Sequence, residues 1–251
     1  MMDHNQWLFA DTTLGALLVI RPQAISVLEK FGIEPFKLPM ARLGETCQDN
    51  GIAWDVFLNE VGKLEVPSKD SDWQHLPLYF LIDFLTHEHR EITSEFFPAI
   101  RNAIIAEEKN PANLEAKSLL VREWPTFMAA LIEHIKSENT FLFPKILRYD
   151  YCARHGTVDP DFSNGSVKVF AALHLLMHEQ RQTSAVTKFL DAIAFSPPPA
   201  EGNDIKRKHL VKILASFQKV LMEHSRLEVD VLFPLATALE KKLYDRVISG
   251  Y

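Results

Sequence analysis

Two stretches of the sequence nearly repeat each other: residues 134–144 read HIKSENTFLFP, and residues 224–234 read HSRLEVDVLFP. Each stretch begins with histidine, carries glutamate at its fifth place and ends on Leu-Phe-Pro. Residues four apart lie on the same face of a helix. His134 is therefore expected beside Glu138, and His224 beside Glu228. The chain carries the same histidine–glutamate pair twice, on two predicted helices.

Both pairs fall inside an apolar stripe of their helix, which a globular protein normally buries. On a helical wheel of about 100° per residue, the flanking apolar side chains lie within about 80° of each histidine. They are Phe127, Leu131 and Leu142 in the first copy and Phe217, Leu221 and Leu232 in the second. Neither stripe contains lysine or arginine. Burying an unpaired carboxylate costs several kcal/mol or raises its pKa, so each glutamate needs a partner.

A metal ion is the partner that both copies favour. Imidazole nitrogen and carboxylate oxygen together suit iron, zinc or manganese. The alternative is a simple hydrogen bond from each histidine to its glutamate across one turn. That alternative explains a single copy well, whereas two copies with matching apolar neighbours favour a metal site.

Length and composition describe an ordinary globular protein. With 251 residues, the chain suits one large domain or a medium domain plus a small one. A net charge of −6 gives no sign of a nucleic-acid partner. The two cysteines do not make a disulfide framework, and neither a signal peptide nor a long apolar span is recognisable. We therefore expect a cytoplasmic protein without membrane contact.

The chain is expected to be all-α, with a small helical domain ahead of a bundle. Two short helical segments, 12–31 with a turn at Arg21-Pro22 and 52–61, form the predicted N-terminal domain, residues 1–61. Residues 62–77 are the predicted linker. Residues 78–251 carry four long helical patterns, which are 78–106, 115–148, 167–195 and 205–247. This pattern predicts an up-down four-helix bundle. Kinks or interrupted turns are expected at Pro98 and Pro125.

Further ligands should come from the other two helices of the bundle. The first offers His87 and His89, and the third offers His174 and His178. His134 and His224 are 90 residues apart, and His89 and His178 are 89 apart (178 − 89), so these two fit a pair of similar hairpins best. His89 also shares a helix face with apolar residues. His87 and His174 remain candidates for an additional ligand or for a supporting contact.

The resulting predicted ligand set is His89, His134, Glu138, His178, His224 and Glu228. Six protein ligands are too many for a closed tetrahedral zinc site. They suit two octahedral-type ions with bridging carboxylates. We expect two iron ions, with manganese as the alternative metal.

The two His-x-x-x-Glu…Leu-Phe-Pro helices, together with two single-histidine helices, resemble the hemerythrin-like HHE family. Residues 66–85 and the N-terminal TLGALLVIRPQAISVLEKFGI resemble the repair-of-iron-centres (RIC, ScdA-type) proteins. That resemblance implies a hemerythrin-type bundle with a binuclear iron centre on the six residues above. It also implies a small ScdA-type domain in front of the bundle. The implied role is repair of stress-damaged iron–sulfur clusters, linked to nitric oxide chemistry.

One departure from that family concerns its usual Cys-Cys pair. Phe36 and Lys37 stand at the corresponding place, and Cys47 lies ten residues beyond Lys37. Cys47 is expected to be a small buried apolar residue. Thiol chemistry is therefore not expected of residues 1–61, whereas partner docking or homodimerisation is.

Three function classes follow from these observations. The first is a di-iron protein of the cluster-repair and stress-response type, whose partners are damaged iron–sulfur proteins and small diatomics. The second is a hemerythrin-like module that binds oxygen or nitric oxide as a sensor or carrier. The third is a structural bundle in which the motif no longer binds metal. The sequence leaves open whether the protein is an enzyme, and it offers no catalytic residue beyond the metal centre.

Overall fold

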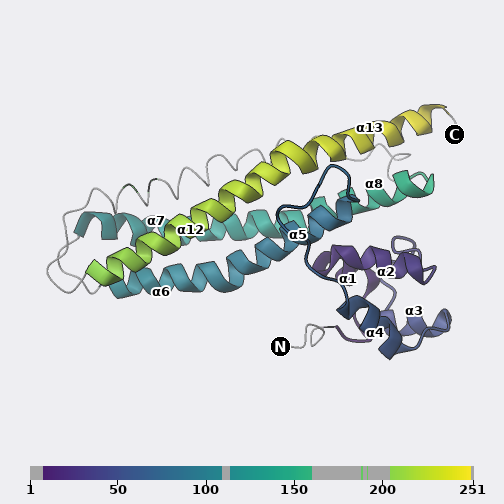
Figure 1. Cartoon of the computed structure of the whole chain (residues 1–251), viewed down its shortest axis with the longest axis horizontal. Helices are drawn as coiled ribbons and strands as arrows, with labels where there is room; N and C mark the ends of the chain where they lie inside the picture. Colours follow the sequence, from purple (N-terminus) through teal and green to yellow (C-terminus); the bar gives the residue numbers. More distant parts are fainter. Residues whose placement is uncertain (1–7, 109–113, 160–187, 189–190, 192–203, 250–251) are drawn as a thin grey trace. The chain divides into compact units, whose positions relative to one another are not determined.

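The computed structural model describes residues 8–108, 114–159, 188, 191 and 204–249. These residues are helical apart from turns, loops and one isolated antiparallel bridge between Thr13 and Arg42. The all-α prediction is therefore confirmed for the described part of the chain (Figure 1). Most of the helix expected at 167–195 lies outside that part.

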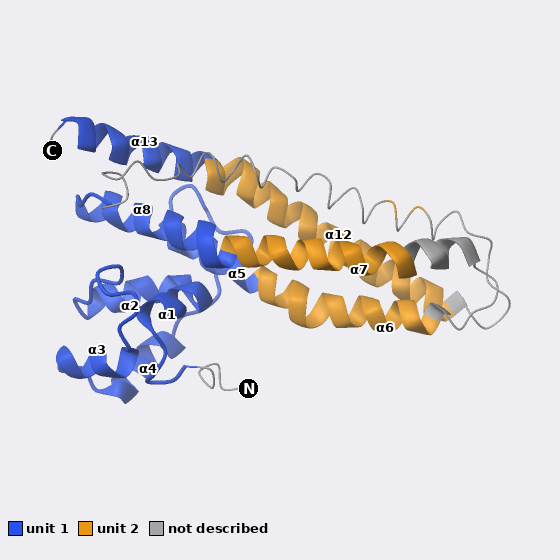
Figure 2. Cartoon of the chain, turned by 180° about the vertical axis from the view of Figure 1, so that it is seen from behind, with its two compact units in different colours: residues 1–87, 139–169, 234–251 blue, residues 88–138, 170–233 orange. Residues whose placement is uncertain are grey.

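The chain divides into two compact units (Figure 2). Unit 1 comprises residues 1–87, 139–169 and 234–251, and unit 2 comprises residues 88–138 and 170–233. The predicted boundaries, with a domain at 1–61 and a linker at 62–77, stay a prediction.

Short helices make up the N-terminal part of unit 1: α1 (Leu14–Ile20), η1 (Pro22–Ala24), α2 (Ile25–Lys30), α3 (Leu43–Asp49) and α4 (Trp54–Gly62). The side chain of Thr13 caps α1 by accepting a hydrogen bond from the backbone N–H of Ala16. Pro22 then opens η1, where its fixed φ suits the first helical position. The expected helices on both sides of the Arg21-Pro22 turn are confirmed. Sequence reasoning missed α3, which is short and lies in a segment rich in glycine and proline.

Ion pairs join this part to α5 (Leu78–Glu91), whose residues up to His87 belong to unit 1, and to α8 (Phe143–His155) of the same unit. Arg21 contacts Asp83 of α5 at 3.1 Å, and the Asp83 side chain is fully buried. Arg154 of α8 contacts Glu29 at 2.7 Å. The same unit contains α13 (Phe233–Ser249), which follows residues of unit 2 in the sequence. The N-terminal helices therefore pack against α5 and α8 within one compact unit.

Phe36, one of the two residues compared above with a Cys-Cys pair, takes part in aromatic packing in unit 1. The ring of Phe36 contacts Tyr151 edge-on, with 5.5 Å between ring centroids. Cys47 is 2% exposed, and burial raises the pKa of its thiol. The interpretation of Cys47 as a small buried apolar residue is confirmed.

The described part of unit 2 contains three long helices that lie side by side: α6 (Phe97–Glu108), α7 (Leu114–Ser137) and α12 (Asp204–Leu227). Both α7 and α12 pack against α6. Their facing sides form one apolar cluster whose largest members are Phe97, Trp124, Phe127 and Phe217. This cluster supplies the hydrophobic stabilisation of unit 2 and extends to the helix turns that carry the candidate ligands.

Among the described residues, three π-helical turns interrupt the long helices: η2 (Ile92–Phe96), η3 (Glu138–Leu142) and η4 (Glu228–Leu232). Each ends two residues before a proline, which is Pro98, Pro144 or Pro234. Proline lacks an N–H, and its ring collides with the carbonyl four residues earlier in an α-helix. A wider π turn relieves that collision. All three turns thus follow from a Phe-Pro pair in the sequence.

The interruption expected near Pro98 is confirmed, because η2 precedes it. At Pro125 no interrupted turn is present, because α7 continues through it as α-helix, and a kink at this position stays a prediction. The third Phe-Pro pair, Phe97-Pro98, is the counterpart of the two repeated Leu-Phe-Pro endings. Sequence reasoning had not connected it with them.

Candidate metal centre

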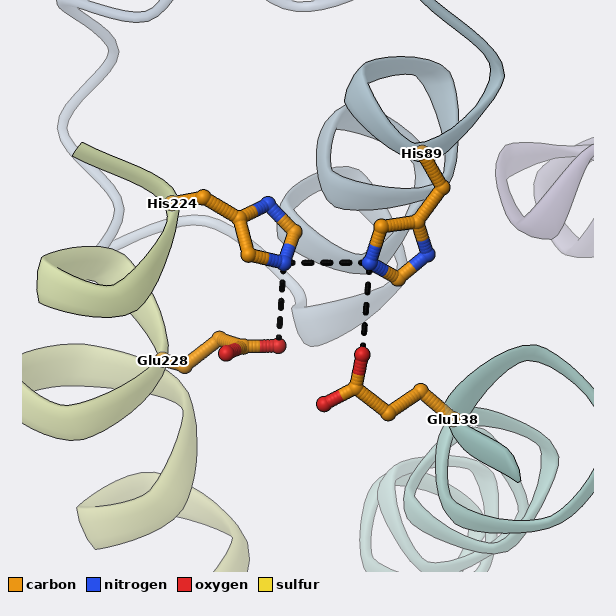
Figure 3. Close-up of side chains that lie close together, drawn as sticks. All are labelled: His89, Glu138, His224 and Glu228. Atoms are coloured by element: carbon orange, nitrogen blue, oxygen red, sulfur yellow. Dashed lines mark hydrogen bonds and ion pairs between the residues drawn. The ribbon is translucent and has the colours of Figure 1, made fainter. Parts of the chain in front are cut away.

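Four of the predicted ligands lie together in unit 2 (Figure 3). His89 comes from the last turn of α5, and His224 from the last turn of α12. Glu138 and Glu228 are the first residues of the π turns η3 and η4. Equivalent positions on the two repeated helices therefore supply the two carboxylates.

The donor atoms of these four residues all lie within 4.8 Å of one another. The Nε2 atoms of His89 and His224 are 3.0 Å apart. His89 Nε2 lies 3.3 Å from Glu138 Oε2, and His224 Nε2 lies 3.3 Å from Glu228 Oε1. Figure 3 shows His224 and Glu228 coming from the same helix, His89 from another and Glu138 from a further one, with the four side chains converging.

The group is withdrawn from water. Glu138 and Glu228 are 0% exposed, His89 is 1% exposed and His224 is 4% exposed. Neither carboxylate oxygen of Glu228 meets strict hydrogen-bond geometry with a described residue, and its Oε1 atom lies 3.3 Å from Nε2 of His224. A buried carboxylate in this state favours a bound cation strongly.

Electrostatics at His224 point in the same direction. Burial by itself lowers the pKa of this imidazole, but the carboxylates of Glu228, Glu88 and Glu138 outweigh burial. Together they hold the pKa of His224 well above its ordinary value of 6.5. The surroundings of this ring are therefore rich in negative charge, as a cation site requires.

The arrangement fits a metal ion on geometry and on chemistry. Imidazole and carboxylate ligands lie about 2.0–2.2 Å from a transition metal, which places neighbouring donor atoms about 3 Å apart. The 3.0–3.3 Å separations between neighbouring donors match that spacing. A buried group of two histidines and two glutamates could hold a metal.

His134 lies at the edge of this group. Its Nε2 atom is 3.2 Å from Glu138 Oε2, and its side chain is 10% exposed. The repeat expected across one helical turn is thus present in both copies, since Glu228 meets His224 in the same way. His134 is not one of the four residues whose donor atoms all lie within 4.8 Å of one another.

Of the remaining histidine candidates, His87 lies within the described residues. His87 is partly buried and does not belong to the group. His174 and His178 lie outside the described residues, so their predicted roles stay predictions.

Sequence reasoning missed one residue of the site, Glu88. Its Oε2 atom lies 3.0 Å from Nδ1 of His224, on the ring nitrogen opposite to the one that faces the group. Glu88 is 8% exposed. The only sequence signal was its position directly before His89. A helical wheel alone does not show that Glu88 faces a residue of another helix.

None of the helices within the described ranges is long and apolar enough to cross a membrane.

No known protein-family profile matches the chain. The chain is similar to two proteins named "iron-sulfur cluster repair protein YtfE". It is 24% identical over 232 residues to the one from Yersinia pseudotuberculosis serotype IB (strain PB1/+). It is 24% identical over 235 residues to the one from Yersinia pestis (strain Pestoides F). Each match covers 91% of this chain and 97% of the relative, so the similarity is not confined to the repeated motifs.

Proposed function

We propose that this chain holds a binuclear non-haem iron centre in a hemerythrin-like four-helix bundle and acts in iron–sulfur cluster repair. The observation that carries the proposal is the group of His89, Glu138, His224 and Glu228, with donor atoms within 4.8 Å of one another. Side chains of this kind gather in a protein interior when a cation offsets their desolvation. A metal accounts for both repeated motifs at once.

The carboxylate count supports a metal over a plain hydrogen-bond network. Glu138 and Glu228 are both fully buried and lie on equivalent π turns. Two buried carboxylates at short distance repel each other unless a proton or a metal lies between them. One protonated histidine leaves this pair only partly neutralised, whereas divalent metal ions neutralise it and accept all four donors.

Two ions, rather than one, follow from the size of the complete ligand set. The four converging residues and His134 supply five donors, and His178 is the proposed sixth. Six protein donors exceed the four of a closed zinc site and suit a binuclear centre with bridging carboxylates. Iron is the metal proposed, and manganese is the alternative.

The assignment to cluster repair is supported by the relatives. Both carry the name of an iron–sulfur cluster repair protein, and the match covers nearly the full length of each chain. The proposed partners are accordingly damaged iron–sulfur proteins, with nitric oxide and oxygen as small ligands of the centre. A cytoplasmic, nitrosative and oxidative stress-response role belongs to the same proposal, as does homodimerisation through residues 1–61.

In this proposal the chain's residues hold, orient and shield the centre. Bound iron would supply redox chemistry and open coordination positions for a diatomic ligand, or would itself be delivered to a cluster. His89 and His224 orient their Nε2 atoms into the group, and Glu138 and Glu228 bring negative charge from two helices. The apolar cluster between α6, α7 and α12 excludes water on one side of the site.

Metal analysis of protein purified without added metal tests the first half of the proposal. We expect about two iron ions per chain and near-ultraviolet absorption in air. One tightly bound zinc ion per chain would overturn the proposal of a binuclear iron centre.

Repair itself is tested on a purified iron–sulfur enzyme whose cluster has been damaged by nitric oxide or peroxide. The iron-loaded protein should restore the enzyme's activity, and the Glu228→Gln variant should not. A stable oxygen adduct without any restored activity would instead support the alternative, a hemerythrin-like module that binds oxygen or nitric oxide.

A further inference from the structure

Glu88 makes a contact with the candidate metal centre that the six predicted ligands do not explain. Its Oε2 atom lies 3.0 Å from Nδ1 of His224, although the two residues are 136 positions apart in the sequence. Glu88 is 8% exposed and His224 is 4% exposed, so little water competes for this contact.

The two ring nitrogens of His224 face different partners. Figure 3 shows one nitrogen directed at His89 and Glu228 and the other directed away from them. The first is Nε2, at 3.0 Å from His89 Nε2, and the second is Nδ1, which meets Glu88. Because a carboxylate only accepts, Nδ1 donates its N–H to Glu88.

That hydrogen bond decides which ring nitrogen keeps its proton when a metal binds. In the metal-bound form the proton on Nε2 is displaced and the proton on Nδ1 stays, so the lone pair on Nε2 binds the metal. A carboxylate behind a ligating histidine also fixes the plane of the ring and makes the imidazole a stronger donor.

We propose that Glu88 is a positioning residue of the metal centre, holding His224 with Nε2 directed at the metal and adding a third carboxylate charge beside it. This inference rests on the proposed function, because it needs a metal in the group. It goes beyond the six predicted ligands. Glu88 does not contact the metal, but it regulates the metal affinity and the reduction potential of the centre.

Two adjacent residues of α5, Glu88 and His89, have different roles at the site. His89 points its Nε2 atom at Glu138 and His224, and Glu88, one residue earlier, reaches the far side of the same His224 ring. The last turn of α5 therefore contributes one proposed ligand, His89, and a contact from Glu88 that supports a second proposed ligand, His224 on α12.

The test compares Glu88→Gln and Glu88→Ala with the wild-type chain. The matched control is Glu95→Gln, which removes an exposed carboxylate from η2, seven residues along the same helical segment. Fe²⁺ affinity is measured by competition with a chromogenic chelator. We expect Glu88→Ala to bind about 10–100-fold more weakly, in line with other supporting carboxylates, and Glu88→Gln to lie between it and wild type. Glu95→Gln should bind as wild type does.

A second measurement separates positioning from a merely structural contribution. In Zn²⁺-loaded wild-type protein with ¹⁵N-labelled histidine, His224 should show a protonated Nδ1 whose proton exchanges slowly with water. In iron-loaded protein, Glu88→Gln should raise the reduction potential, because one negative charge beside the centre is lost. Thermal melts of the metal-free variants report any loss of packing on its own.

The outcomes distinguish this inference from the function on which it rests. Wild-type protein that binds no metal would overturn both. Metal-binding wild-type protein with an unprotonated Nδ1 on His224 would overturn only the role of Glu88, whether or not the variants fold. Variants with lower melting temperatures but wild-type affinity and potential would also overturn it.

Discussion

The Nε2 atoms of His89 and His224 lie 3.0 Å apart, although 135 positions separate the two residues in the sequence. Each histidine also contacts a glutamate, His89 that of the first repeated motif and His224 that of its own motif. The two copies of the motif therefore meet at one place through a histidine that belongs to neither copy. A repeat that looks like two separate sites in the sequence forms a single group in space.

Replacing Glu228 with glutamine should remove metal from the protein. The variant keeps the size of the side chain but loses a buried carboxylate that lies 3.3 Å from His224. Metal that binds only the folded state raises the melting temperature. A variant that has lost the metal should therefore lose this rise in melting temperature as well. Metal content and paired melts with and without Fe²⁺ measure the effect.

Asp230→Asn is the matched control, since it removes an exposed carboxylate from the same π turn. Asp230→Asn should keep both the metal and the metal-dependent rise in melting temperature. Full metal content in Glu228→Gln would mean that the repeated motifs serve packing, and the proposed metal function would have to be given up.

Leu221→Ala should have the opposite profile, with metal retained and stability lowered. Leu221 is 5% exposed and belongs to the apolar cluster of unit 2. Truncating a buried leucine leaves a cavity and costs about 2–5 kcal/mol of unfolding free energy. Met222→Ala, at a neighbouring position that is 56% exposed, should change the unfolding free energy by less than about 0.5 kcal/mol. Chemical denaturation measures the unfolding free energy of both variants. Equal losses of unfolding free energy in the two would place Leu221 outside the core.

Arg21→Ala should destabilise unit 1 without affecting the metal. Arg21 contacts the fully buried Asp83 at 3.1 Å and donates to the backbone oxygen of Leu64 at 2.6 Å. Removing one partner of a buried ion pair costs about 3–5 kcal/mol, because a charge stays behind in the interior.

The exposed ion pair between Arg42 and Asp11 offers the control, with side chains 57% and 84% exposed. Arg42→Ala should cost no more than about 1 kcal/mol. Urea unfolding and metal analysis of both variants test the pair. Loss of metal in Arg21→Ala, with the helices intact, would argue against a centre confined to unit 2.

Glu60 should make the stability of the N-terminal helices depend on acid. Hydrogen bonds from Lys30 and Lys63 lower the pKa of Glu60 from 4.5 to about 2. A carboxyl group with a lowered pKa in the folded state contributes its stabilisation above pH 4.5, and that contribution is lost as pH falls toward 2. The effect is modest, because the side chains of Lys30 and Lys63 are 60% and 61% exposed, and water and salt screen their contacts with Glu60.

Glu60→Gln should therefore lower the melting temperature at pH 7 and leave it nearly unchanged at pH 2. Glu65→Gln, an exposed carboxylate five residues later, should show no such difference. An equal shift of Glu60→Gln at both pH values would show that the lysine contacts do not persist in solution.

The sequence by itself determined the all-α class, the three long helical patterns that the structure describes and the short helices around Arg21-Pro22. These features depend on local spacing, because apolar periodicity and turn residues act within a few positions of the chain. The repeated motif likewise predicted that His134 meets Glu138, and His224 meets Glu228, across one turn. Both contacts are present.

Only the tertiary structure decided which side chains from different helices converge. The choice of His89 over His87 rested on spacing and helix face, and the packing of unit 2 places His89 against His224 while leaving His87 outside the group. The contact of Glu88 with His224 could not be predicted, because adjacent residues on a helix point about 100° apart and a wheel does not say which neighbour each one faces. Local sequence fixes the face of a helix, whereas long-range packing fixes its rotation and register against its neighbours, and a metal centre requires both.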